Sequence, residues 1–160
     1  MQLIYDQLIP GNPVWDFCCD HGYMGLNAYE SGEFPSIHFV DQVRHIIEQL
    51  ERRFEQEHYI KDHSAQAFFL PLAGEDLLTP VEGNVVIAGV GAFTIERILR
   101  SISSRGLLRA KKLILCPQGR AEKLLQSLPE IPDFDYEIGN EDCQIDERGR
   151  IRKLLIFNKK

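Results

Sequence analysis

Two short apolar runs that each end in an aspartate constrain the fold of this 160-residue chain more than any other feature. The first run begins at Val14 and reaches Asp16, and the second covers residues 36–41 and ends at Asp41. A tight turn and a helix-compatible stretch from about Gly22 separate them. This pattern predicts the first strand–helix–strand unit of a nucleotide or nucleoside fold. In such units an acid at the tip of the second strand accepts hydrogen bonds from ribose hydroxyls.

The turn after the first run is unsuited to a pyrophosphate. A dinucleotide site needs the pattern G-x-G-x-x-G, whereas this turn reads Cys18-Cys19-Asp20-His21-Gly22. The Asp20 carboxylate would repel a pyrophosphate. It would suit a cationic cofactor such as S-adenosylmethionine, whose ammonium and sulfonium groups favour carboxylates.

Strand and helix signals alternate along most of the chain. Expected strands cover residues 14–18, 36–41, 66–70, 84–90 and 111–116, and expected helices cover 22–31, about 43–57, 93–103 and 120–128. This alternation predicts an α/β protein with a doubly wound parallel sheet.

The end of the chain follows another pattern. Two strands, at about 134–145 and 150–158, are joined by Asp146-Glu147-Arg148-Gly149, and only a β-hairpin fits that spacing. Five parallel strands closed by an antiparallel hairpin make a mostly parallel seven-stranded sheet. That is the Rossmann-like arrangement of Class I methyltransferases, and a plain Rossmann dehydrogenase is not built in this way.

Length and composition predict a single domain over residues 1–160 that is large enough to bury a core. The chain has no run of 18 apolar residues and no signal-peptide pattern, so we expect a cytoplasmic protein that does not use a membrane. The four cysteines form no C-x-x-C pair, which favours small buried side chains over disulfides or a metal site.

Positive charge gathers in one window although the chain carries a net charge of −6. From Glu96 to Lys123 there are eight basic residues and two acids, so the window carries +6 and the rest of the chain −12. A basic face over Arg97 to Lys123 could contact RNA phosphate, while a solvated helix face is the alternative reading. The basic residues are Arg97, Arg100, Arg105, Arg109, Lys111, Lys112, Arg120 and Lys123.

Several of these segments together resemble one family, the bacterial tRNA (adenine(22)-N(1))-methyltransferases. Residues 16–23 are similar to its D-x-G-x-D-H-x-Y signature, residues 84–92 to its I-A-G-M-G-G strand end, and residues 113–118 to its L-I-L-Q-P-N segment. Cys18, Ala92 and Gln118 stand where the family has Gly, Gly and Asn. Family members usually continue into a helical extension beyond the position of Lys160.

The resemblance implies a set of site residues around S-adenosylmethionine. Asp16, Cys18, Cys19, Asp20, His21 and Tyr23 would surround its methionine end, Asp41 its ribose, and Gln42 its adenine, with Glu75 or Asp76 at the adenine amino group. Gly89, Val90 and Gly91 would form the floor under the sulfonium. The implied substrate is tRNA, and Gln118 would lie next to the target base.

Methyl transfer requires positioning more than covalent help, and an acid or amide near the exocyclic amine would orient an adenine N1. Asp20 and Gln118 are the candidate catalytic residues, although Asp20 could only cap a helix and Gln118 could be a turn residue. Two other functions stay open at this point. The chain could methylate a small molecule or a protein, or it could be a degenerate relative without activity.

Overall fold

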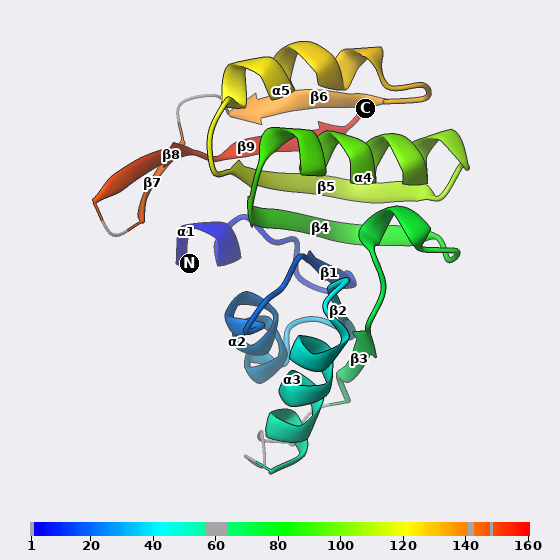
Figure 1. The fold of residues 1–160 in the computed structure, drawn as a ribbon, viewed down its shortest axis with the longest axis vertical. Coiled ribbons are helices and arrows are strands. Elements are labelled where there is room, and N and C mark those ends of the chain that lie inside the picture. Colours follow the sequence, from blue (N-terminus) through cyan, green and yellow to red (C-terminus); the bar gives the residue numbers. More distant parts are fainter. Residues whose placement is uncertain (1, 57–63, 141–142, 148) are drawn as a thin grey trace.

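The structure, a computed structural model, describes residues 2–56, 64–140, 143–147 and 149–160. Seven strands form one sheet in the order β3-β2-β1-β4-β5-β9-β6 (Figure 1). The strands of the main sheet are β1 (Val14–Phe17), β2 (Ser36–Val40), β3 (Gln66–Leu70), β4 (Val81–Val90), β5 (Leu108–Pro117), β6 (Tyr136–Asn140) and β9 (Leu155–Lys159).

The first five strands are parallel, and β9 is antiparallel to both β5 and β6. The doubly wound, mostly parallel seven-stranded sheet with an antiparallel end is therefore confirmed. The strand order reverses between β1 and β4, which are neighbours in the sheet although two strands separate them in sequence. Ligands of open α/β sheets bind outside the carboxyl ends of the strands at such a reversal.

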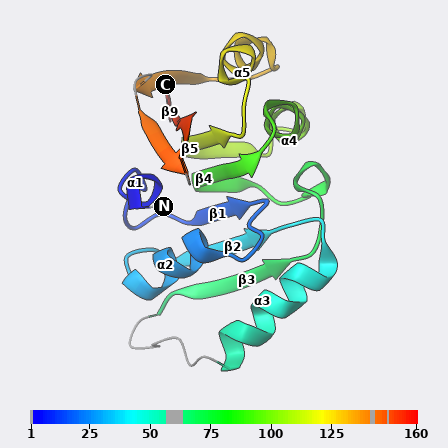
Figure 2. The same ribbon diagram turned by 60° about the vertical axis from the view of Figure 1, so that its left-hand side comes forward.

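Helices cover both faces of the sheet, so its central strands are apolar on both sides. Met24 and Leu26 of α2 (Tyr23–Ser31) pack with Val86 in one core cluster, which also holds residues of α1 (Gln2–Tyr5) and α3 (Arg44–Gln56). Helices α4 (Ala92–Ser104) and α5 (Ala121–Ser127) belong to the other cluster. Figure 2 shows α4 beside β4 and β5 and α5 beside β6, while α2 and α3 lie beside β1, β2 and β3. Two short 3₁₀ turns are also present, η1 (Gly74–Asp76) between β3 and β4 and η2 (Leu128–Glu130) directly after α5.

The closing hairpin is present, but the prediction of two continuous strands is wrong. Each strand is divided, and the inner parts β7 (Gln144–Glu147) and β8 (Arg150–Lys153) form a separate two-stranded ribbon. Residues 141–142 and 148 of the predicted hairpin, like the predicted helix end at residue 57, lie outside the described part.

A proline explains where the main sheet stops. The β5–β9 pairing ends at Leu115 and Leu155, and two more steps in the same register would place Pro117 opposite Lys153. Proline has no N–H to donate to a strand partner. The chain instead closes the ribbon at its base, where the Leu154 N–H donates to the Cys143 carbonyl at 2.8 Å, and the buried Leu154 anchors it.

Candidate functional site

Two cavities lie at the carboxyl ends of the parallel strands, where the strand order reverses. The first, here named the β5-side cavity, reaches Cys116 of β5 and has a volume of about 380 Å³. The second, the β2-side cavity, reaches Val40 at the end of β2 and has a volume of about 340 Å³. Cys18, Asp20 and Gly89 line both, so the two cavities meet at the turn after β1 and at the end of β4. This is the place where the sequence predicted a cofactor.

The turn after β1 is held in an unusual backbone conformation. Cys18 and Asp20 have φ angles of 55° and 48°, and Gly22 has 68°. A left-handed φ costs a residue with a Cβ roughly 1–2 kcal/mol, so surrounding contacts must hold the turn. The Cys19 N–H donates to the Val40 carbonyl at 3.3 Å, which ties the turn to the end of β2.

Asp16 lies beneath this turn and is almost completely buried, with 5% of its surface exposed. Its Oδ2 accepts a hydrogen bond of 3.1 Å from the Gly25 N–H in the first turn of α2. Burial raises the pKa of the Asp16 carboxyl to about 7, the Gly25 hydrogen bond lowers it, and the Asp41 charge raises it further. Asp16 thus caps α2 and also lines the β5-side cavity.

Asp41 organises the β2-side cavity. Its Oδ1 accepts the Val43 N–H at 2.9 Å, and its Oδ2 accepts the Asp20 N–H at 3.3 Å. Each carboxylate oxygen has a second lone pair, so the side chain can still accept hydrogen bonds from a ligand. Gln42 lines the same cavity next to Asp41.

Glu75 forms the other acidic wall of the β2-side cavity, where its Oε1 lies 2.9 Å from the Arg97 Nε. The neighbouring Asp76 is exposed and lines neither cavity. Val90 lines the β2-side cavity, whereas Gly91 lines neither and precedes α4 as its N-cap. Of the two acids that the resemblance placed at the adenine, the structure therefore brings only Glu75 to the cavity.

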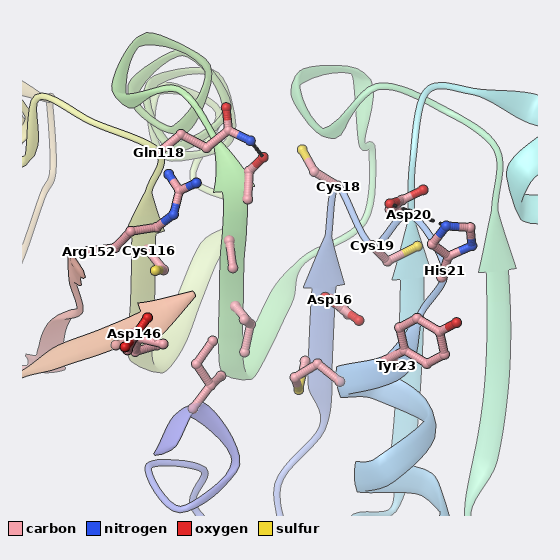
Figure 3. A pocket seen from close by; sticks show the side chains of 16 residues that line it. Asp16, Cys18, Cys19, Asp20, His21, Tyr23, Cys116, Gln118, Asp146 and Arg152 are labelled. Atoms are coloured by element: carbon pink, nitrogen blue, oxygen red, sulfur yellow. Dashed lines mark hydrogen bonds and ion pairs between the residues drawn. The ribbon is translucent and has the colours of Figure 1, made fainter. Parts of the chain in front are cut away.

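Gln118 links the ends of β4 and β5 over the β5-side cavity (Figure 3). Its side-chain Nε2 donates to the Gly89 carbonyl at 2.5 Å, and its backbone N–H donates to the Val90 carbonyl at 2.8 Å. These contacts fix the amide, and no described residue bonds to its Oε1. His21 and the half-exposed Tyr23 line the opposite wall.

The ribbon supplies a wall that the sequence reasoning missed. Ile145, Asp146 and Arg152 line the β5-side cavity, and Figure 3 shows the Arg152 guanidinium below the Gln118 side chain. The only available signal was the basic composition of the last strands, which does not show that a ribbon folds back over the site.

The two adjacent thiols at the turn are neutral. Burial raises the pKa of Cys18 to about 12, helped by the charge of Asp41, and burial also raises the pKa of Cys19. The thiolate is the nucleophilic form of cysteine, so neither side chain is suited to nucleophilic catalysis at neutral pH. Within the described ranges, no group of three or more potential ligands gathers as a metal site, and no helix is long and apolar enough to cross a bilayer.

The structure does not gather the basic window on one face. Arg105 donates to the carbonyls of Glu75 and Leu77 at 2.6 and 2.7 Å, and Lys112 donates to the Gln7 carbonyl at 2.9 Å. Arg109 lies near the amino end of β5, and Arg120 follows the carboxyl end of this strand. The two arginines therefore lie at opposite ends of the strand. The predicted single basic face over Arg97 to Lys123 is therefore wrong.

The sequence matches a family of methyltransferase domains over residues 1–154. No curated protein matches it.

Solved structures share the fold over 99% of the chain. The Streptococcus pneumoniae protein Sp1610, assigned as a tRNA (m1A22) methyltransferase, is 24% identical with a TM-score of 0.75, and it has also been solved with S-adenosyl-L-methionine. TrmK of M. capricolum, solved with S-adenosyl-homocysteine, is 17% identical with a TM-score of 0.74. The chain spans 68% and 66% of these two proteins. A Methanosarcina mazei protein described as a SAM-dependent methyltransferase is 13% identical with a TM-score of 0.72, and the chain spans 97% of it.

Proposed function

Since the chain belongs to this family of methyltransferase domains, we propose that it binds S-adenosylmethionine and methylates N1 of an adenine in tRNA. The observation that carries the proposal is the meeting of two cavities at Cys18, Asp20 and Gly89. A cofactor with its adenosine in the β2-side cavity would extend its methionine end past Cys18 and Asp20 into the β5-side cavity, where it would meet the target base. The sequence resemblance and the tRNA methyltransferases among the similar structures support tRNA as the substrate class.

The residues of the two cavities fit this cofactor. Asp41 can accept hydrogen bonds from the ribose hydroxyls, since both of its oxygens keep a free lone pair. The carboxyl groups of Asp16 and Asp20, which line the β5-side cavity, would lie near the ammonium and sulfonium charges of the cofactor. Glu75, which is held by Arg97, would lie on the adenine side.

Gln118 and Asp20 would serve the transfer by positioning and electrostatics. When bound, S-adenosylmethionine supplies a methyl group on a positively charged sulfur. The Gln118 Oε1 would accept the exocyclic N–H of the target adenine and so orient its N1 lone pair. The Asp20 carboxylate would stabilise the positive charge that an adenine acquires when it is methylated at N1.

Calorimetry with S-adenosylhomocysteine tests the cofactor site. Asp41→Asn should weaken binding at least tenfold, since a charge-assisted hydrogen bond contributes about 1.5–3 kcal/mol. Asp76→Asn is the matched control, because Asp76 lies one residue from Glu75 and outside both cavities. Equal affinities of the two variants would remove Asp41 from the site.

The substrate is tested separately, with tRNA transcripts and S-adenosylmethionine labelled in its methyl group. We expect 1-methyladenosine after digestion, and reduced yield with Gln118→Ala. If the protein binds S-adenosylhomocysteine but leaves the RNA unlabelled, the cofactor proposal stands and the tRNA proposal falls.

A further inference from the structure

A third cavity, of about 290 Å³, lies between the loop that follows β5 and the ribbon of β7 and β8. Gln118 and Arg152 line both this ribbon cavity and the β5-side cavity, so the two are adjacent. Its lining residues are Pro117, Gln118, Gly119, Arg120, Ala121, Glu122, Gln144, Ile151, Arg152 and Lys153.

The ribbon cavity has the charge of an anion site. Three of its lining residues are cations, namely Arg120, Arg152 and Lys153, and Glu122 is its one acid. The amides of Gln118 and Gln144 add neutral donors. This concentration of positive charge stands out because the whole chain carries a net charge of −6.

Lys153 and Glu122, which both line the cavity, form an ion pair. The Lys153 Nζ lies 2.9 Å from the Glu122 Oε1, with 40% and 68% of the two side chains exposed. Such an exposed pair contributes little to stability, so a phosphate can replace the carboxylate at low cost. The remaining Glu122 charge would then repel the phosphate and weaken its binding.

We propose that the ribbon cavity holds a backbone phosphate of the RNA, beside the nucleotide whose base enters the β5-side cavity. This inference rests on the proposed tRNA methyltransferase function. An enzyme that modifies a base must take it out of its stack, and phosphate contacts fix the register of the strand while it does so. Since Gln118 and Arg152 face both cavities, a strand that places its base in one brings its backbone to the other.

The test compares two charge-removing double variants in tRNA binding over a range of salt concentrations. Arg120→Asn with Lys153→Gln removes two cations from the cavity, and asparagine tolerates the φ of 58° at position 120. Arg109→Gln with Lys111→Gln removes the same charge from the first half of β5, away from the cavity. The cavity variant should bind more weakly, and the slope of log affinity against log salt should become shallower by about 1.4–1.8 for two lost contacts.

The control variant should keep the wild-type slope, and both should bind S-adenosylhomocysteine as the wild type does. Glu122→Gln provides a change in the opposite direction and should tighten tRNA binding. If the cavity variant keeps the wild-type slope, or if the control variant loses as much tRNA affinity, the ribbon cavity is not a phosphate site. The proposal that tRNA is the substrate is unaffected by that result. If the wild type binds no tRNA at low salt, the substrate proposal fails and this inference fails with it.

Discussion

At Cys18 a side chain occupies a backbone conformation that glycine adopts without cost. Its φ of 55° is left-handed, and the residue lines both cavities at the point where they meet. Replacing Cys18 by glycine removes a backbone strain of roughly 1–2 kcal/mol from the folded state. Glycine also makes the unfolded chain more flexible, which favours unfolding by about 0.4–1 kcal/mol.

We therefore expect Cys18→Gly to raise the urea midpoint of unfolding and to tighten S-adenosylhomocysteine binding by opening the cavity wall. Cys18→Ala is the control, since it also removes the thiol but keeps the Cβ. A glycine variant that is less stable than the alanine variant would show that the strain is absent.

Asp16 should make stability depend on pH. Between its ordinary pKa of 3.8 and its folded pKa of about 7, the folded protein holds a proton that the unfolded chain has released. Raising the pH through this window therefore favours unfolding. Urea titrations should show a fall in stability from about pH 4 to pH 7 that is absent in Asp16→Asn. Asp135→Asn, on an exposed loop, should retain the wild-type profile.

Among the elements, α4 and η1 are held together in part by an arginine that shapes the β2-side cavity. Arg105, just after α4, donates to the carbonyls of Glu75, Leu77 and Ser101. These bonds hold the segment that carries the Glu75 side chain into the cavity. Arg105 is thus a positioning residue, although it lines neither cavity itself.

Arg105→Gln should destabilise the protein by about 1.5–3 kcal/mol, because carbonyl groups lose charged donors. It should also weaken S-adenosylhomocysteine binding through the loosened Glu75. Arg100→Gln, on the same helix, loses only the part-buried pair with Glu96 and should cost about 1 kcal/mol at most. Chemical denaturation and calorimetry measure the two effects separately. Unchanged cofactor affinity in Arg105→Gln would limit its role to stability.

In the whole molecule, the ribbon lies outside the main sheet. The Leu154 N–H bond to the Cys143 carbonyl closes its base, and the main sheet continues from β9 without it. Replacing Gln144–Lys153 by Asn-Gly, which forms a two-residue turn, should leave the sheet and cofactor binding intact while tRNA affinity is lost. Circular dichroism, calorimetry and gel shifts test the three expectations. Loss of the folded state would show that the ribbon is part of the core.

The sequence predicted the sheet well because strand position follows from apolar runs that end in acids such as Asp16 and Asp41. It could not predict contacts that depend on three-dimensional neighbours. The bond from Gly25 to Asp16 joins a helix to a strand, and the charges at Arg109 and Arg120 separate only because β5 lies between them. The Cys143–Leu154 bond that divides the hairpin likewise has no local sequence signal.

The position of the ribbon outside the main sheet has an evolutionary consequence. Insertions, deletions and substitutions between Cys143 and Leu154 would change the wall that meets the substrate without shifting any strand of the main sheet. Selection can therefore act on substrate choice almost independently of the scaffold that binds the cofactor. A lineage with this architecture can acquire new targets by exchanging the segment from Gln144 to Lys153.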